Sequence, residues 1–320
     1  MDFWLTDDQQ ALGDMVSTFV ADRFALEDLP DAEDAGTVMD RDRWRTLADL
    51  GVFSLAADGM GVREAVVVFE QLGRGLVPGP LVSTWLAAGL IDGAGDGTTL
   101  VGMLEPQPGA TLVEHADIID ACLLWADDTL WQVPISALQL QRVERPLDAG
   151  APVWQVTGPV TPEALGATAL ASGDDATTRY LTGVVLTAAL QLGVALAAGE
   201  LATAYAKERE QFGRPIGGFQ AVKHLCADML VKAEVARAAV YAAACALDGA
   251  SDDDPAVAAS AAKVVAGDAA LANGRYGIQV HGGMGFTWEV HAQRYWKRAV
   301  SLDVSFGSVS VHSEIMADAL

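Results

Sequence analysis

The sequence predicts an α+β protein in which an N-terminal helical domain and a C-terminal four-helix bundle flank a small, reduced β domain. Three observations support this. Apolar residues recur at helical spacing in the first third, short apolar runs alternate with turn residues in the middle, and alanine-rich runs fill the remainder. We therefore expect domains over residues 1–96, 97–165 and 166–320.

The N-terminal domain is expected to be a succession of helices. Thr6 precedes two aspartates and Gln9, which is the pattern of a capping box at a helix start. Gly51, Gly73 and the Pro78-Gly79-Pro80 triplet are positions where helices end or the chain turns. A further helix is expected to begin after Asp40 and to end at Gly51. Others are expected over Arg63–Gly73 and Leu81–Ile91.

The central region has the texture of short strands. Asp127-Asp128 separates two apolar runs and indicates a hairpin turn. The expected strands lie within Thr99–Leu104, Ile118–Trp125, Leu130–Pro134, Leu138–Val143 and Val153–Val156.

Helical texture returns after Gly173-Asp174-Asp175 and lasts to the end of the sequence. The most apolar stretch, residues 183–199, is shorter than the roughly 20 residues of a comfortable membrane span and runs into Glu200. We interpret it as a central bundle helix. The long helices are expected to contain Leu186–Ala206, Val222–Ala250 and Ala256–Gly277.

Composition excludes several classes of protein. With 43 acidic and 20 basic side chains the formal net charge is −23, which argues against a nucleic-acid or anionic-membrane partner. A hydrophobic content of 51% argues against disorder. The three cysteines form neither a disulfide framework nor a zinc motif, and the N-terminus has no signal-peptide pattern, so a cytoplasmic protein without a structural metal is expected.

Two segments carry the functional signal. The glycine cluster of residues 282–285 follows a helix rather than a strand, so by itself it indicates an inter-helix turn and not a dinucleotide-binding fingerprint. It occurs, however, within QVHGGMG (residues 279–285), downstream of REQFG (residues 209–213) and of Phe219-Gln220. In this order and at this separation, the two segments resemble the acyl-CoA dehydrogenase family.

The resemblance implies FAD as cofactor and α,β-dehydrogenation of an acyl-CoA, in which a carboxylate removes the α-proton and the flavin accepts the β-hydride. It assigns Arg209 to the FAD pyrophosphate, because a guanidinium group can bind two phosphate oxygens at once. The alternative is a structural role, in which Arg209 is a cation that stabilises the carbonyl groups and the dipole at a helix C-terminus. Phe212 and Gln220 match residues around the adenosine. Gln279, Gly282 and Gly283 match a turn whose backbone approaches the cofactor closely.

The sequence departs from the family at the catalytic base. An ungapped count places the usual glutamate position on Phe306 and the family's second position on Gly183, and neither side chain can accept a proton. The nearby carboxylates of Asp303 and Glu289 are expected to have solvated or structural roles. In the β domain, residues 104–111 keep only the Glu-Pro of a TEPxxGSD-like loop, and the tryptophans are expected in the core: Trp125, Trp131 and Trp154.

The chain thus keeps the half of the flavin site that a neighbouring subunit supplies in homo-oligomeric relatives, and lacks the other half. It resembles the short, base-lacking subunit of actinobacterial heteromeric steroid-CoA dehydrogenases. That resemblance implies an α2β2 heterotetramer with a full-length sibling subunit, a CoA thioester from steroid (cholesterol) degradation as substrate, and an electron-transferring flavoprotein as acceptor. Two alternatives stay open: an inactive scaffold that does not contact flavin, and a self-sufficient homo-oligomer that uses Asp303.

Overall fold

A computed structural model describes residues 5–36, 38–106 and 109–319. The chain separates into two compact units. The first comprises Met1–Pro30, Val66–Val77 and Val184–Leu320, and the second comprises Asp31–Ala65 and Pro78–Gly183. Each unit is described by itself below.

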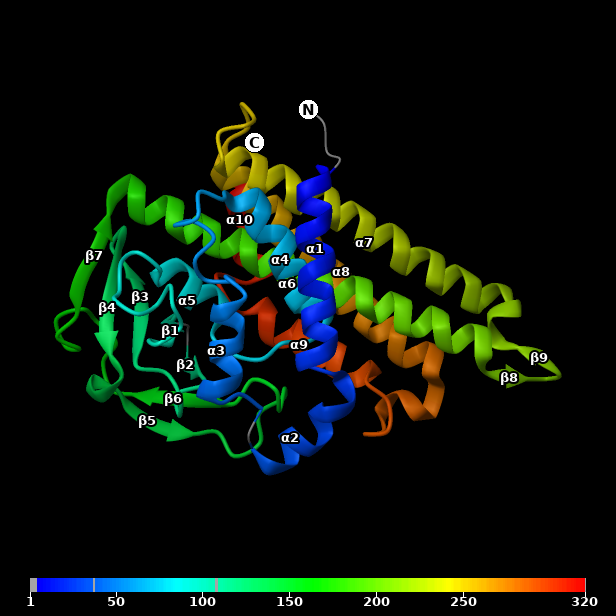
Figure 1. The fold of residues 1–320 in the computed structure, drawn as a ribbon. Coiled ribbons are helices and arrows are strands. Elements are labelled where there is room, and N and C mark those ends of the chain that lie inside the picture. Colours follow the sequence, from blue (N-terminus) through cyan, green and yellow to red (C-terminus); the bar gives the residue numbers. More distant parts are fainter. Residues whose placement is uncertain (1–4, 37, 107–108, 320) are drawn as a thin grey trace. The chain divides into compact units, whose positions relative to one another are not determined.

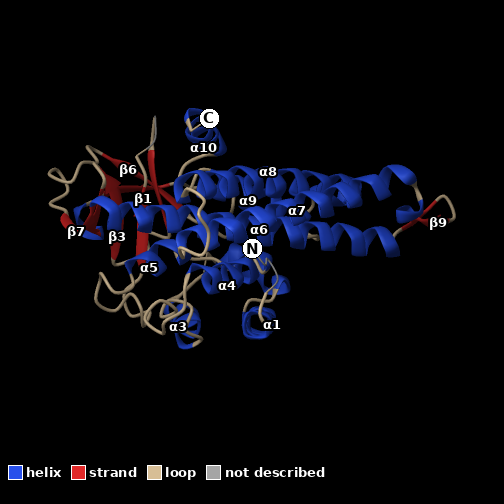
Figure 2. Ribbon diagram, turned by 90° about the horizontal axis from the view of Figure 1, so that it is seen from above, coloured by secondary structure: helices blue, strands red, loops and turns tan. Residues whose placement is uncertain are grey.

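The first unit is a helical bundle whose long helices run side by side in both views (Figures 1 and 2). The capping box predicted at Thr6 is present, because the Gln9 backbone N–H donates to Thr6 Oγ1 at 3.2 Å and the Thr6 N–H donates to Gln9 Oε1 at 3.1 Å. The elements that lie in this unit or extend into it are α1 (Asp7–Arg23), η1 (Leu26–Asp28), the start of α2 (Leu29–Ala35), α4 (Val62–Arg74), α6 (Gly173–Glu208), β8 (Glu210–Gln211), β9 (Arg214–Pro215), η3 (Ile216–Gly218), α7 (Gln220–Leu247), α8 (Pro255–His281), η4 (Gly282–Phe286), α9 (Ala292–Asp303) and α10 (Val309–Asp318).

Small residues allow the helices of this unit to approach closely. A Cβ atom on Gly73 of α4 would collide with the backbone of Leu190 in α6, and one on Gly193 of α6 would collide with the backbone of Glu70. On the other side of α6, buried Asn273 of α8 donates to the carbonyls of Ala195 and Met229, each at 2.9 Å. These contacts fix the packing of α4, α6, α7 and α8, and they confirm the predicted helical bundle.

Among the described residues, two helical stretches are long and apolar enough to cross a membrane by length and composition alone: Gly173–Glu208 and Pro255–Phe286. In the first, 94% of the apolar window is buried within the protein. That burial is typical of a core helix and agrees with the interpretation of residues 183–199 as a bundle helix.

The second unit contains two small sheets, of strand orders β1-β3-β4-β7 and β2-β6-β5. The predicted hairpin turn is present, since Asp127 and Asp128, both at a φ of 51°, join β3 to β4. The elements that lie in this unit or extend into it are α2 (Leu29–Ala35), α3 (Arg41–Asp49), α5 (Leu81–Ala87), β1 (Val101–Leu104), β2 (Thr111–Glu114), β3 (Ala121–Ala126), β4 (Thr129–Pro134), η2 (Ile135–Ala137), β5 (Gln139–Arg142), β6 (Val153–Thr157) and β7 (Thr168–Ser172), besides the starts of α4 and α6.

The structure differs from expectation at several boundaries in this unit. Strand β7 pairs with β4 although it lies beyond residue 165, so the sheet continues past the range expected for the β domain. Strand β2 was not expected either, and α5 ends at Ala87 rather than Ile91 because the backbone leaves the helical region at Ala88 and turns at Gly89. The division into three domains stays a prediction.

Candidate cofactor site

The REQFG segment forms a short hairpin directly after α6. The backbone N–H of Arg209 donates to the carbonyl of Tyr205 at 2.8 Å, and its own carbonyl accepts from the N–H of Ile216 at 2.8 Å. Phe212 and Gly213 form the turn between β8 and β9, with φ values of 53° and 77°. The backbone of Arg209 is therefore held on both sides, while its guanidinium side chain is exposed.

The tip of the hairpin presents an aromatic ring to solvent. Phe212 is 92% exposed, and its ring meets Phe219 edge-on with a centroid distance of 6.1 Å. The Arg214 guanidinium lies 4.1 Å from the centroid of Phe219. Exposed Gln220 begins α7 directly after this cluster. The hairpin thus offers a cation, an aromatic ring and an amide on one exposed segment.

The glycines of QVHGGMG separate into two kinds. Gly282 ends α8 with a φ of 62°, and no described atom lies within 4 Å of a Cβ placed on Gly282 or Gly283. A Cβ on Gly285, in contrast, would lie 2.5 Å from the Ile278 carbonyl oxygen. Gln279 is exposed and lies three residues before Gly282, close to one helical turn away. Gly282 and Gly283 are therefore open to an approaching group, whereas Gly285 is required for packing.

A side-chain pair that sequence reasoning did not single out joins the two motifs. The rings of Tyr205 in α6 and His281 in α8 stack with centroids 4.2 Å apart and an interplanar angle of 23°. The Tyr205 hydroxyl lies 3.8 Å from the sulfur of Met284, and His281 Nδ1 lies 2.7 Å from the carbonyl of Gly277. These contacts bring the start of the hairpin to the glycine turn. The only sequence signal was the spacing of Tyr205, one helical turn before Arg209.

The position expected for the base is closed. Phe306 is 3% exposed with a φ of 53°, and His312 Nε2 donates to its carbonyl at 2.7 Å. Asp303 Oδ1 is buried next to Gly267 without a hydrogen-bond partner among the described residues. Glu289 is exposed on the loop before α9. The Asp303 oxygen therefore faces the bundle interior, which disfavours this residue as a base that meets substrate.

The Glu-Pro segment and the three tryptophans expected in the core lie in the second unit. Of residues 104–111, Gln107 and Pro108 lie outside the described residues, and Glu105 forms a bridge with Leu112. The three tryptophans expected in the core are half-buried rather than fully enclosed: Trp125 stacks on Tyr180 at 4.8 Å, Trp131 donates to the Ala126 carbonyl at 3.2 Å, and Trp154 lies under Arg142.

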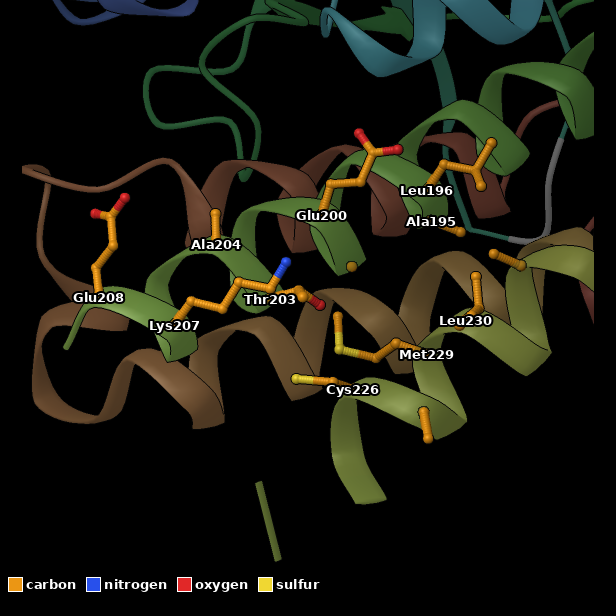
Figure 3. Close-up of a pocket in the computed structure, with 13 residues that line it drawn as sticks. Ala195, Leu196, Glu200, Thr203, Ala204, Lys207, Glu208, Cys226, Met229 and Leu230 are labelled. Carbon is orange, nitrogen blue, oxygen red and sulfur yellow. The ribbon is translucent and has the colours of Figure 1, made fainter. Parts of the chain in front are cut away.

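A groove between α6 and α7 extends to the C-terminal end of α6 (Figure 3). It has a volume of about 630 Å³ and a mostly apolar lining that includes Leu196, Met229 and Leu230. Lys207 and Glu208, the two residues before Arg209, lie at the end of α6 that borders it. No pattern in the sequence predicted this groove.

Comparisons with known proteins identify the family. Residues 6–98 match the model of the acyl-CoA dehydrogenase N-terminal domain, and residues 176–320 match that of the C-terminal domain. The chain is 30% identical to acyl-CoA dehydrogenase IpdE2 of Mycolicibacterium smegmatis, over 92% of this chain and 93% of that protein. The chain therefore belongs to the acyl-CoA dehydrogenase family, as its two motifs indicated, and FAD is the cofactor of that family.

Solved structures show the same fold. The steroid ACAD Tcur3481-Tcur3483 superposes with a TM-score of 0.82 at 24% identity, covering 98% of this chain and 97% of that one. The ChsE4-ChsE5 complex from Mycobacterium tuberculosis superposes with a TM-score of 0.81 at 22% identity, covering 99% and 98%. The exposed guanidinium of Arg209 and the open backbone at Gly282 and Gly283 fit the phosphates of a dinucleotide, so the residues present are compatible with FAD.

Proposed function

We propose that this chain is one subunit of a heteromeric FAD-dependent acyl-CoA dehydrogenase that catalyses α,β-dehydrogenation of a CoA thioester. A full-length sibling subunit supplies the catalytic base and the platform for the flavin ring, in an α2β2 assembly with one FAD for every two chains. One observation carries the proposal: the base position is a buried phenylalanine, while the hairpin and the glycine turn are exposed and intact.

In this proposal the chain binds and orients the cofactor rather than performing proton transfer. FAD, when bound, supplies the hydride acceptor. Arg209 places a permanent positive charge near the pyrophosphate, Phe212 and Gln220 border the adenosine, and Gln279 with Gly282 and Gly283 provides polar and backbone contacts. No residue of this chain is assigned the role of base.

The substrate, acceptor and location are further parts of the proposal. We propose a steroid-derived CoA ester as the substrate, since the structural neighbour Tcur3481-Tcur3483, which shares the fold, is a steroid ACAD. We propose an electron-transferring flavoprotein as acceptor and the cytoplasm as location.

Co-expression tests the proposal. The chain is produced alone and together with a full-length acyl-CoA dehydrogenase of the same organism, and the flavin content of each purified sample is measured by absorbance. The expected result is a colourless or insoluble chain alone and a yellow complex with about 0.5 FAD per chain. One FAD per chain in a homo-oligomer produced alone would refute the heteromer.

Arg209→Ala in the co-expressed complex tests the cofactor contact. Loss of one partner of a charge-assisted contact typically costs a few kcal/mol, so we expect flavin to be lost on gel filtration. Arg145→Ala is the matched control because Arg145 is an exposed arginine of the second unit. Full flavin occupancy in Arg209→Ala would favour the scaffold alternative.

A further inference from the structure

The segments that meet around the hairpin and the glycine turn have the opposite charge balance from the rest of the chain. Residues 207–224 and 273–298 contain eight Lys and Arg residues and three Asp and Glu residues, whereas the whole chain has 20 and 43. This end of the bundle is therefore cationic on a strongly acidic protein, and a surface of this kind attracts an acidic partner.

Besides Phe212 of the hairpin, two large aromatic side chains are exposed within this cationic region. Phe286 is 74% exposed and Trp288 is 60% exposed, on the loop that follows the glycine turn. Lys297 Nζ lies 4.2 Å from the Trp288 ring centroid, and the Arg294 guanidinium carbon lies 5.4 Å from it. We call Phe286, Trp288, Arg294 and Lys297 the Trp288 patch.

The loop that carries the patch is held in place. The backbone N–H and the hydroxyl of Thr287 both donate to the Met284 carbonyl, at 2.9 and 2.8 Å. Arg294, only 3% exposed, lies with Nη1 3.4 Å from the Trp288 carbonyl. Because the loop backbone is held by these contacts, less conformational entropy is lost when a partner binds. Rigid, exposed Trp residues beside Arg are typical anchors of protein interfaces.

We propose that the Trp288 patch is the anchor by which this chain docks on its sibling subunit, whose facing surface is an apolar pocket bordered by carboxylates. This rests on the proposed function, in which a sibling exists. Partly exposed Lys297 favours carboxylates at the rim, and the exposed ring favours an apolar pocket. Arg294 is buried and directed at the Trp288 carbonyl, so its fork is not presented to a phosphate group, which favours a protein over a nucleotide.

The patch is continuous with the proposed cofactor contacts. Phe286 is the last residue of η4, the element that begins at Gly282. A sibling anchored on Trp288 is thereby held next to Gly282 and Gly283, where its FAD would meet the backbone of this chain. Docking and cofactor sharing would then be achieved by one loop.

Subunit affinity tests this assignment in the co-expressed complex. The dissociation constant between the two chains is measured by mass photometry for wild type, Trp288→Ala and Lys297→Glu. We expect Trp288→Ala to weaken assembly about 30-fold and Lys297→Glu about tenfold, with the Lys297 effect shrinking at high salt. Thermal melting of each co-expressed complex, at a concentration at which the chains are assembled, checks that the variant chain is folded.

The second unit offers a matched pair of controls. Arg142 lies over Trp154 with its guanidinium carbon 5.5 Å from the ring centroid, so Trp154→Ala and Arg142→Glu remove a similar cation–ring pair elsewhere. These controls are expected to leave the dissociation constant within twofold of wild type.

The possible outcomes separate this inference from the proposed function. Assembly of both patch variants with wild-type affinity would overturn the docking site while the heteromer stands. Normal assembly of Trp288→Ala with loss of flavin would also overturn it and would assign the ring to the cofactor. A wild-type chain that assembles only with itself and carries one FAD per chain would overturn the proposed function. It would also exclude a sibling subunit as the partner that binds the Trp288 patch.

Discussion

Replacing Gly283 and Gly285 in turn tests whether the glycine turn has separate functional and structural positions. A Cβ on Gly283 meets no described atom within 4 Å, so Gly283→Ala is expected to leave stability unchanged or to raise it by about 0.4–1 kcal/mol, because alanine restricts the unfolded chain. If cofactor approaches the backbone here, the added methyl group displaces it. Loss of one such contact, about 1–3 kcal/mol, corresponds to roughly 5- to 150-fold weaker flavin retention.

Gly285→Ala has the opposite expectation. Its Cβ would lie 2.5 Å from the Ile278 carbonyl oxygen and 2.9 and 3.0 Å from the Cα and carbonyl carbon of the same residue. All three are backbone atoms, so no rotamer change relieves the overlap, and we expect destabilisation of about 1–3 kcal/mol.

The assay has two readouts on the co-expressed complex: the melting temperature by circular dichroism and the flavin that remains after gel filtration. Gly283→Ala should melt at or above the wild-type temperature with little flavin, and Gly285→Ala should melt lower. A Gly283→Ala complex that retains full flavin would refute the close-approach interpretation.

Three further predictions concern the bundle. Glu70→Ala should lower the free energy of unfolding in urea by about 1–3 kcal/mol, because buried Glu70 accepts from the Tyr241 hydroxyl at 3.1 Å and lies 3.6 Å from partly exposed Arg237; an unchanged midpoint would contradict this. Burial lowers the pKa of His312 below its usual 6.5, so protonation favours the unfolded state; the melting temperature should fall as pH drops below about 6.5, and less steeply in His312→Gln. The co-expressed complex with Asp303→Asn should keep its acyl-CoA dehydrogenase turnover within about twofold of wild type, because Asp303 Oδ1 is buried in the bundle. Complete loss of turnover would instead indicate that Asp303 is the base.

The sequence predicted the features that depend on local chemistry. The capping box at Thr6, the Asp127-Asp128 turn and the long alanine-rich helices each follow from neighbouring residues, and all three are present. Strand β7 was missed because none of its side chains is fully buried, so it carries little hydrophobic signal. Helix α6 begins at Gly173, where the sequence predicted the return of helical structure, although its first turns are mostly polar.

The candidate site was predictable in its motifs but not in its geometry. The stacking of Tyr205 on His281 joins residues far apart in the chain, and no local sequence pattern predicts such a contact. Gly283 and Gly285 are equivalent as letters of one motif, yet only Gly285 packs against a neighbouring backbone. The exposure of Trp288 and its contact with Lys297 likewise depend on how the chain folds back from η4 to α9.

The FAD content of the purified protein tests the central claim most directly. The account predicts about 0.5 FAD per chain in the co-expressed complex and no bound FAD in this chain produced alone. A stable, yellow homo-oligomer of this chain with one FAD per chain and acyl-CoA dehydrogenase turnover would contradict it.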